Sequence, residues 1–205
     1  MGQSSGELPN GKAIDKVDCT GASGFSYALY LPSAYVAEKT WPVLFIFDAD
    51  AQGMVPLELF KAAAEKYGYI IVSSNNSASD DPTVPNLQAM VAMYNDATSR
   101  FSLNKQRMYA AGYSGGARIA CDMAYRYAPQ FAGVIGAGSG FPTDHDPTPD
   151  TPFVFFGTVG NLDFNYYEMR LLEPKLKSAG IPYRIRVFDG EHDWPPAELC
   201  TEELE

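Results

Sequence analysis

Short apolar runs alternate with longer amphipathic segments along this chain, and this alternation restricts its possible folds more than any other feature. Parallel strands need a crossover connection, usually a helix, and strands buried on both faces are apolar throughout. The pattern therefore predicts an α/β fold with a mostly parallel central sheet and helices on both faces. The predicted strands span 25–32, 42–48, 69–74, 107–113, 131–139, 152–157 and 183–190. The predicted helices span 55–68, 84–101, 115–128 and 164–180, the last bent or split at Pro174.

Length and charge narrow the class of protein. The chain has 205 residues, of which 46% are apolar, and this is enough for one sizeable core. We therefore predict a single domain over residues 12–205, preceded by a flexible segment at 1–11, with the loop at 140–152 too short for a cap domain. A net charge of -10 without a cluster of basic residues argues against binding to nucleic acid. No apolar run approaches the ~18 residues of a membrane span.

The segment YAAGYSGGARIA, residues 109–120, contains the pattern G-x-S-x-G around Ser114. A predicted strand leads into this serine and a predicted helix leaves it, at the sheet edge where ligands gather in such folds. The glycines at 112, 115 and 116 would permit the sharp turn that exposes the hydroxyl. A glycine-rich turn without chemistry is the alternative, but the agreement of pattern, strand and helix favours a nucleophile.

A nucleophilic serine needs a base and an acid to orient that base. Of the two histidines, His192 directly follows the last predicted strand, whereas His145 sits in a proline-rich loop and is predicted to be solvated. Asp163 follows another strand and completes the chain order serine, acid, histidine, although aspartate there is also typical of a helix N-cap. Asp189 is close in sequence to His192 and Asp150 precedes its strand, so both suit the role less well.

An oxyanion hole would require two backbone N–H groups, one of them from Gly115, which follows the serine. The loop FDADAQG at 47–53 occupies the place of the second donor, with Asp50 as the candidate and Gln52 as the alternative. The same loop begins like a calcium-binding loop, but its twelfth position is Leu59 instead of glutamate and a strand precedes it. We therefore predict no metal and no organic cofactor.

Four further residues are candidates for substrate contact. Trp194 and Tyr113 would line the mouth of the site, and Asn75 and Asn76 end another central strand. Ordinary packing or turn formation is the alternative for all four. Phe141 is predicted to lie with Trp194 at the rim of an open cleft.

The three cysteines leave at least one thiol unpaired. Cys121 lies on the apolar face of a predicted helix and is expected to be buried. Cys19 and Cys200 could form a disulfide, which would imply an oxidising compartment, and the sequence leaves this open. The polar start of the chain has no apolar signal core, so either targeting is absent or a leader has been removed. A periplasmic or secreted location is favoured.

The segments ALYLPSAY, GYSGGAR and EHDWPP resemble the polyhydroxybutyrate-depolymerase and feruloyl/acetylxylan-esterase-like branch of the α/β-hydrolase superfamily, from about residue 12 to residue 198. The resemblance implies the α/β-hydrolase fold, a triad of Ser114, Asp163 and His192, and an oxyanion site that includes Gly115. The chain departs from this branch in one loop, which usually reads H-G-x-G and here carries Asp48 and Asp50.

The function expected from these features is a serine carboxylic ester hydrolase that works through an acyl-enzyme. Its substrates would be short-acyl or aryl and carbohydrate esters, either small molecules or groups attached to a polymer. A peptidase or an acyl transferase could use the same triad. A catalytically inactive binding protein could keep the same fold, and the unusual aspartate loop is the feature that favours this alternative.

Overall fold

The computed structural model describes residues 8–79 and 81–204, so most of the predicted flexible segment lies outside the described residues. Within these ranges, the strands form one sheet of eight members. Their bounds are β1 Ala13–Asp18, β2 Ser26–Tyr30, β3 Trp41–Phe47, β4 Ile70–Ser74, β5 Leu103–Tyr113, β6 Phe131–Ala137, β7 Val154–Gly160 and β8 Tyr183–Phe188. The order across the sheet is β1-β2-β4-β3-β5-β6-β7-β8.

The sheet is mostly parallel, as the sequence predicts. Only β2 runs antiparallel to its neighbours β1 and β4, and every pair from β4 to β8 is parallel. This is the α/β-hydrolase fold, and no cap domain interrupts it in the part of the chain that the structure describes. Parallel strands bring the carboxyl ends of β3, β5, β7 and β8 to one edge, so the loops that follow them meet there.

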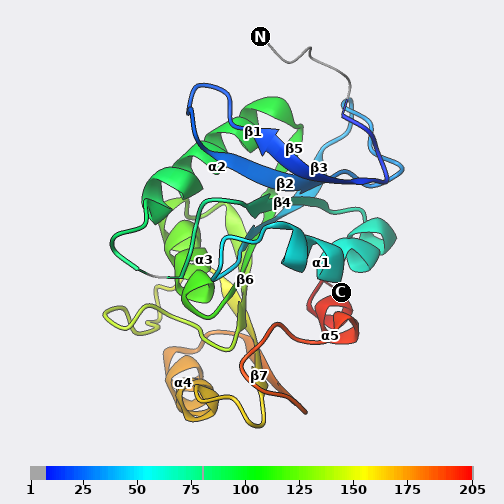
Figure 1. The fold of residues 1–205 in the computed structure, drawn as a ribbon. Coiled ribbons are helices and arrows are strands. Elements are labelled where there is room, and N and C mark those ends of the chain that lie inside the picture. Colours follow the sequence, from blue (N-terminus) through cyan, green and yellow to red (C-terminus); the bar gives the residue numbers. More distant parts are fainter. Residues whose placement is uncertain (1–7, 80, 205) are drawn as a thin grey trace.

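Two groups of helices cover the two faces of the sheet. The helices are α1 Met54–Tyr67, α2 Asn86–Arg100, α3 Gly115–Arg126, α4 Tyr166–Ala179 and α5 Ala197–Leu204. Helices α1 and α5 pack on one face, and α2, α3 and α4 pack on the other (Figure 1). None of the helices in the described ranges is both long enough and apolar enough to cross a membrane.

The sequence prediction was incomplete at three points. It did not include β1, an edge strand with largely polar residues, or the short helix α5. It also expected a bend or split at Pro174; α4 is one continuous helix from Tyr166 to Ala179, so the chain is not split there. Pro174 and Arg170 are both exposed, so water can satisfy the carbonyl group that the proline leaves without a helical partner.

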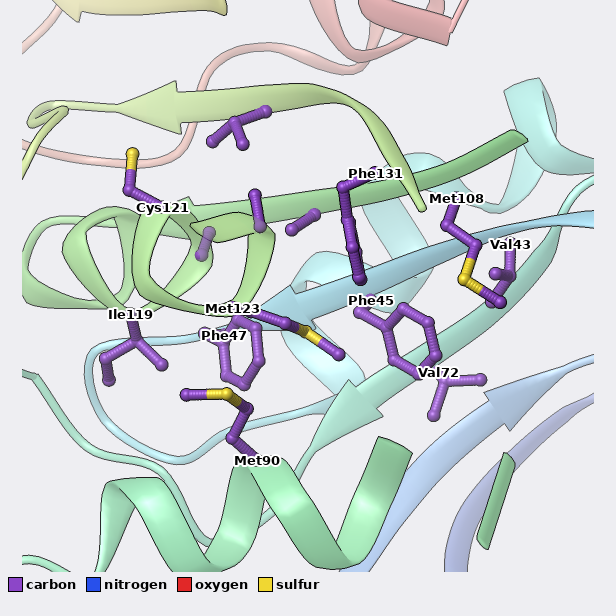
Figure 2. Close-up of a cluster of buried hydrophobic side chains, with 14 of the residues drawn as sticks. Val43, Phe45, Phe47, Val72, Met90, Met108, Ile119, Cys121, Met123 and Phe131 are labelled. Carbon is purple, nitrogen blue, oxygen red and sulfur yellow. The ribbon is translucent and has the colours of Figure 1, made fainter. Parts of the chain in front are cut away.

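The core is divided by the sheet, because successive residues of a strand point to opposite faces. On β3, Phe45 and Phe47 pack toward α2 and α3, while Leu44 and Ile46 pack toward α1. Figure 2 shows Phe47 beside side chains of α2 and α3, including Met90 and Met123.

All three cysteines are free thiols. Cys121 is fully buried, as predicted. Cys19 and Cys200 are not bridged, since they lie in the two core clusters on opposite faces of the sheet. The disulfide that the sequence left open is therefore not formed in this structure.

Candidate active site

Ser114 sits at a strained turn between β5 and α3. Its φ of 54° and ψ of -126° lie in a region that costs a non-glycine residue about 1–3 kcal/mol. The turn depends on the two glycines of the motif. A Cβ atom on Gly112 would overlap the carbonyl group of Gly116, and a Cβ atom on Gly116 would overlap the carbonyl oxygen of Phe47. The close approach of α3 to β5 and β3 therefore explains why this segment needs glycine on both sides of the serine.

The structure brings Ser114, His192 and Asp163 together. The Nε2 atom of His192 lies 2.9 Å from the Oγ atom of Ser114, and its Nδ1 atom lies 2.8 Å from Oδ1 of Asp163. The serine and the histidine are 78 residues apart in sequence, and the histidine and the aspartate are 29 apart. The three side chains come from the loops after β5, β7 and β8, which meet at the carboxyl edge of the sheet.

Asp163 is buried and held from a second direction. Its Oδ1 atom also accepts the backbone N–H of Asn165 at 2.7 Å, and the side-chain amide of Asn165 donates to the carbonyl oxygen of Gly138 at 2.9 Å. Neither alternative acid has this environment. Asp189 accepts a hydrogen bond from Asn161, and Asp150 is exposed in the turn before β7.

Gly138 is a neighbour of the triad that the sequence analysis missed. Its φ is 64°, and a Cβ atom there would lie 2.9 Å from Cε1 of His192 and 3.1 Å from Oδ2 of Asp163. Glycine alone leaves room for the imidazole and the carboxylate at this point. Its position directly after β6, at the carboxyl edge, is the signal that could have identified it.

The loop after β3 differs from the prediction for the oxyanion site. The backbone N–H groups of Asp50 and Gln52 both donate to Oδ1 of Asp48, at 2.9 and 3.2 Å. The expected donor, Asp50, is therefore already engaged by a buried carboxylate within its own loop. Within the described residues, the N–H group of Ala49 has no hydrogen-bond acceptor.

The ring of Tyr113 contacts both the imidazole of His192 and the indole of Trp194. Trp194 is only 7% exposed, so it does not line an open mouth as expected, and its indole N–H donates to Oδ2 of Asp48 at 2.8 Å. Tyr113 donates its hydroxyl to the carbonyl oxygen of His192 at 2.7 Å, and the two ring centroids are 4.9 Å apart. Burial, and then the surrounding carboxylates, raise the pKa of Tyr113 to about 12, so it remains a donor at neutral pH.

Three other predicted contacts are not brought to the triad. The amide of Asn75 donates to the carbonyl oxygen of Asp15, and Asn76 accepts from the N–H of Ser26, so both hold β4 against the β1–β2 hairpin. Phe141, expected at the rim, is buried against Phe153 and Phe155.

Two more aromatic contacts involve the two histidines. His145 is exposed, as expected, and stacks on Tyr125. Phe164 was not predicted, although its ring centroid lies 4.0 Å from that of His192 and its side chain is 75% exposed.

This arrangement combines a hydroxyl, an imidazole and a carboxylate in one hydrogen-bonded chain, which is the composition of a base-activated nucleophile. Gly115 begins α3 immediately after the serine, and the first N–H groups of a helix have no partner within the helix. Among the described residues, no cluster of three or more histidine, cysteine or carboxylate side chains is arranged to hold a metal ion.

Comparison with known proteins gives structural neighbours only. No protein-family model matches the chain, and a search of curated proteins also gave no match. A ferulic acid esterase structure superposes with a TM-score of 0.72 at 19% identity, covering 94% of this chain and 95% of the other. A fluorophosphonate-binding serine hydrolase from Staphylococcus aureus gives 0.75 at 14% identity, with 96% and 99% covered. A mutant feruloyl esterase module from Clostridium thermocellum, complexed with sinapinate, gives 0.69 at 13% identity, with 96% and 88% covered. At these identities the likeness establishes the shared fold.

Proposed function

We propose that this protein is a serine carboxylic ester hydrolase that works through an acyl-enzyme. The observation that carries the proposal is the hydrogen-bonded chain from Ser114 through His192 to Asp163, with contacts of 2.9 and 2.8 Å. The strained serine turn supports it, because non-glycine residues held in a sparsely populated backbone region cluster at functional sites. The esterases and serine hydrolases among the structural neighbours support it further.

In the proposed reaction, Oγ of Ser114 attacks the ester carbonyl carbon while Nε2 of His192 takes the hydroxyl proton. The resulting imidazolium returns this proton to the leaving alcohol, and the acyl group stays on the serine. Water then attacks the acyl-enzyme, with His192 again as base, and releases the carboxylic acid. Asp163 holds Nδ1 in its protonated form and stabilises the imidazolium at each stage.

The oxyanion formed during both attacks needs backbone donors. We assign one to the N–H of Gly115, which follows the nucleophile. For the second, Ala49 replaces Asp50 as the candidate, because Asp48 already accepts the N–H groups of Asp50 and Gln52. The carboxylate of Asp48 lies in this same loop, and its three hydrogen-bond donors disperse its negative charge.

The substrates we propose are short-acyl esters and aryl or carbohydrate esters. The lack of a cap domain in the described chain supports this, since a long acyl group needs a covered apolar tunnel to bury roughly 0.8 kcal/mol per CH₂. A peptidase or acyl transferase would use the same triad, and an inactive binding protein would have the same fold.

Covalent labelling separates these alternatives. A fluorophosphonate probe should modify the wild-type protein and fail to modify the Ser114→Ala variant, while Ser178→Ala, at an exposed position on α4, should be labelled normally. Ester, thioester and amide substrates with acyl groups from acetyl to palmitoyl then define the class. Absence of labelling would support the inactive binding protein, and preference for amides would support the peptidase.

A further inference from the structure

The turn before α4 and the first two turns of this helix carry an unusual apolar surface, which begins next to His192. Its four large side chains are Leu162, Phe164, Tyr167 and Leu171, which are 71%, 75%, 77% and 66% exposed. No other large apolar side chain in the described residues is more than 46% exposed. We call these four residues the apolar platform. Helix α4 lies near one end of the sheet, far from β1 (Figure 1).

Three members of the platform follow one another from the turn before α4 into its first two turns. Residues four apart on a helix are neighbours on its surface, which relates Tyr167 to Leu171, while Phe164 lies in the turn just before the helix. At a rise of 1.5 Å per residue, Tyr167 and Leu171 are about 6 Å apart along the helix, and Phe164 extends the platform beyond its N-terminal end. The whole platform is therefore longer than an acetyl or butyryl group and suits a larger apolar group.

One end of the platform touches the catalytic imidazole of the proposed reaction. The ring centroid of Phe164 lies 4.0 Å from that of His192. In the proposed reaction this imidazole protonates the leaving alcohol, so the alcohol oxygen must come within hydrogen-bond distance of it. The group attached to that oxygen then lies within reach of the Phe164 ring.

We propose that the apolar platform binds the alcohol part of the ester, and that this alcohol is an extended apolar or aromatic one. The inference rests on the proposed function and narrows its substrate class. Phe164 contacts the first part of the alcohol, and Tyr167 and Leu171 contact its distal part.

The root of the platform is held rigidly against the histidine loop. Asn161 donates to Asp189 and accepts the N–H of Gly190, and the N–H of Leu162 donates to the carbonyl oxygen of Gly190. A Cβ atom on Gly160 would overlap the carbonyl oxygen of Glu191, which shows how closely the two loops pack. A surface fixed in this way loses little conformational freedom when it binds a ligand.

Other occupants fit the surface less well. Four side chains offer a few hundred Å² at most, less than the roughly 800 Å² that each partner buries in a stable protein interface. A lipid surface attracts basic segments, whereas this chain carries a net charge of -10. The substrate, which must approach His192 in any case, is the occupant that the position favours.

The test first compares two esters that form the same acyl-enzyme, and then an ester with a different acyl group. Propyl acetate and biphenylpropyl acetate have alcohols of nearly equal basicity, because the rings are separated from the oxygen by three carbons. Propyl biphenylbutanoate carries the same rings on the acyl side. We expect wild-type kcat/KM to be about tenfold higher for biphenylpropyl acetate than for propyl acetate, and the double variant Tyr167→Ser, Leu171→Gln to lose most of this preference. Val154→Thr, a similar change at the amino end of β7, away from the carboxyl edge that carries the triad, should keep it.

A binding measurement without turnover completes the test. Calorimetry with biphenylpropanol and the Ser114→Ala variant should show binding that the added double substitution weakens about tenfold. This arm tests the platform even if fluorophosphonate labelling disproves the esterase. An unchanged preference and unchanged binding in the double variant would overturn the proposal. So would a preference for the rings on the acyl side, or a wild-type dimer in sedimentation that the double variant abolishes, since a second copy would then cover the platform.

Discussion

Asp48 and Trp194 lie 146 residues apart in sequence and form a buried hydrogen bond of 2.8 Å between the indole N–H and Oδ2 of the carboxylate. The other carboxylate oxygen accepts two N–H groups of the loop after β3. Trp194 follows His192 by two residues, so this bond joins the candidate oxyanion loop to the loop of the candidate base. Aspartate at position 48, the departure from the usual H-G-x-G loop, is thus explained as a structural link.

Removal of the indole N–H donor of Trp194 should lower the stability of the protein and slow its reaction with a fluorophosphonate. Trp194→Phe leaves Oδ2 of Asp48 buried without its donor, which should lower the free energy of unfolding by about 1–3 kcal/mol. It should also slow fluorophosphonate labelling several-fold, because the two loops lose their link. Urea unfolding and labelling kinetics measure the two effects. Trp41→Phe is the control, since that indole bonds to the carbonyl oxygen of Val36 near the surface. Equal effects of the two variants would contradict the linking role.

The assignment of the acid is tested by a pair of aspartates. Asp163→Asn should lower kcat on the order of 10⁴-fold while the protein still folds, because asparagine cannot hold the imidazole in the required tautomer. Asp189→Asn, which alters an exposed hydrogen bond to Asn161, should have little effect on kcat. Steady-state hydrolysis of an activated acetate ester measures both. Near-full activity of Asp163→Asn would remove this residue from the triad.

Gly138 should be required for activity more than for stability. Gly138→Ala introduces a methyl group 2.9 Å from Cε1 of His192, and a displaced imidazole should cost on the order of 10²-fold in kcat. The control is Gly180→Ala, because Gly180 has a similar φ of 72° but open space around it. Each variant pays the conformational cost of a positive φ, about 1–2 kcal/mol. Circular dichroism during urea unfolding checks this cost. Retained activity in Gly138→Ala would show that the imidazole has room to move.

The charged form of Asp96 should stabilise the protein, and this stabilisation should be lost in acid. Burial alone would raise the pKa of Asp96, but hydrogen bonds from Arg100, Tyr27 and Thr20 outweigh it and hold this pKa below its ordinary value. The stabilisation is therefore complete above the unfolded pKa of about 3.9 and is lost as the pH falls through the folded value. Asp96→Asn should lower the free energy of unfolding by about 2–4 kcal/mol at pH 7, and by progressively less toward pH 3. Urea unfolding between pH 3 and pH 7 tests this, and a pH-independent difference would contradict it.

Glu203 should have the opposite effect on stability, which should fall as the pH rises. Both of its carboxylate oxygens are buried, and this burial, together with the nearby charge of Glu202, raises the pKa of Glu203 well above its ordinary value. Stability is then complete below the unfolded pKa of about 4.3 and is lost as the pH rises toward the folded value. Glu203→Gln should therefore stabilise the protein by at least about 1 kcal/mol at pH 8 and by less at pH 5. The matched control is Glu198→Gln, an exposed position on the same helix, and an equal effect of both variants would contradict the prediction.

Much of the fold could be predicted from local patterns. Continuous apolar runs such as β3 and β4, buried on both faces, identify central parallel strands, and the glycines around Ser114 identify a sharp turn. These signals are local, because strand burial and backbone sterics depend on residues that are close in sequence. Elements without a strong hydrophobic periodicity were not predicted, among them the polar edge strand β1 and the short helix α5.

The sequence by itself determined the chain order of the candidate serine, acid and histidine, and the sheet edge at which each would lie. Only the tertiary structure decided which groups are hydrogen-bonded there. In the folded chain, the N–H of Asp50 donates to Asp48 and Trp194 is buried. Cys19 and Cys200 lie on opposite faces of the sheet, and the ring of Phe164 packs against His192. The physical reason is that hydrogen bonds and ring contacts depend on distances of a few ångströms between loops far apart in sequence. Those distances are set by how the sheet and its helices pack, and no local pattern of residues records them.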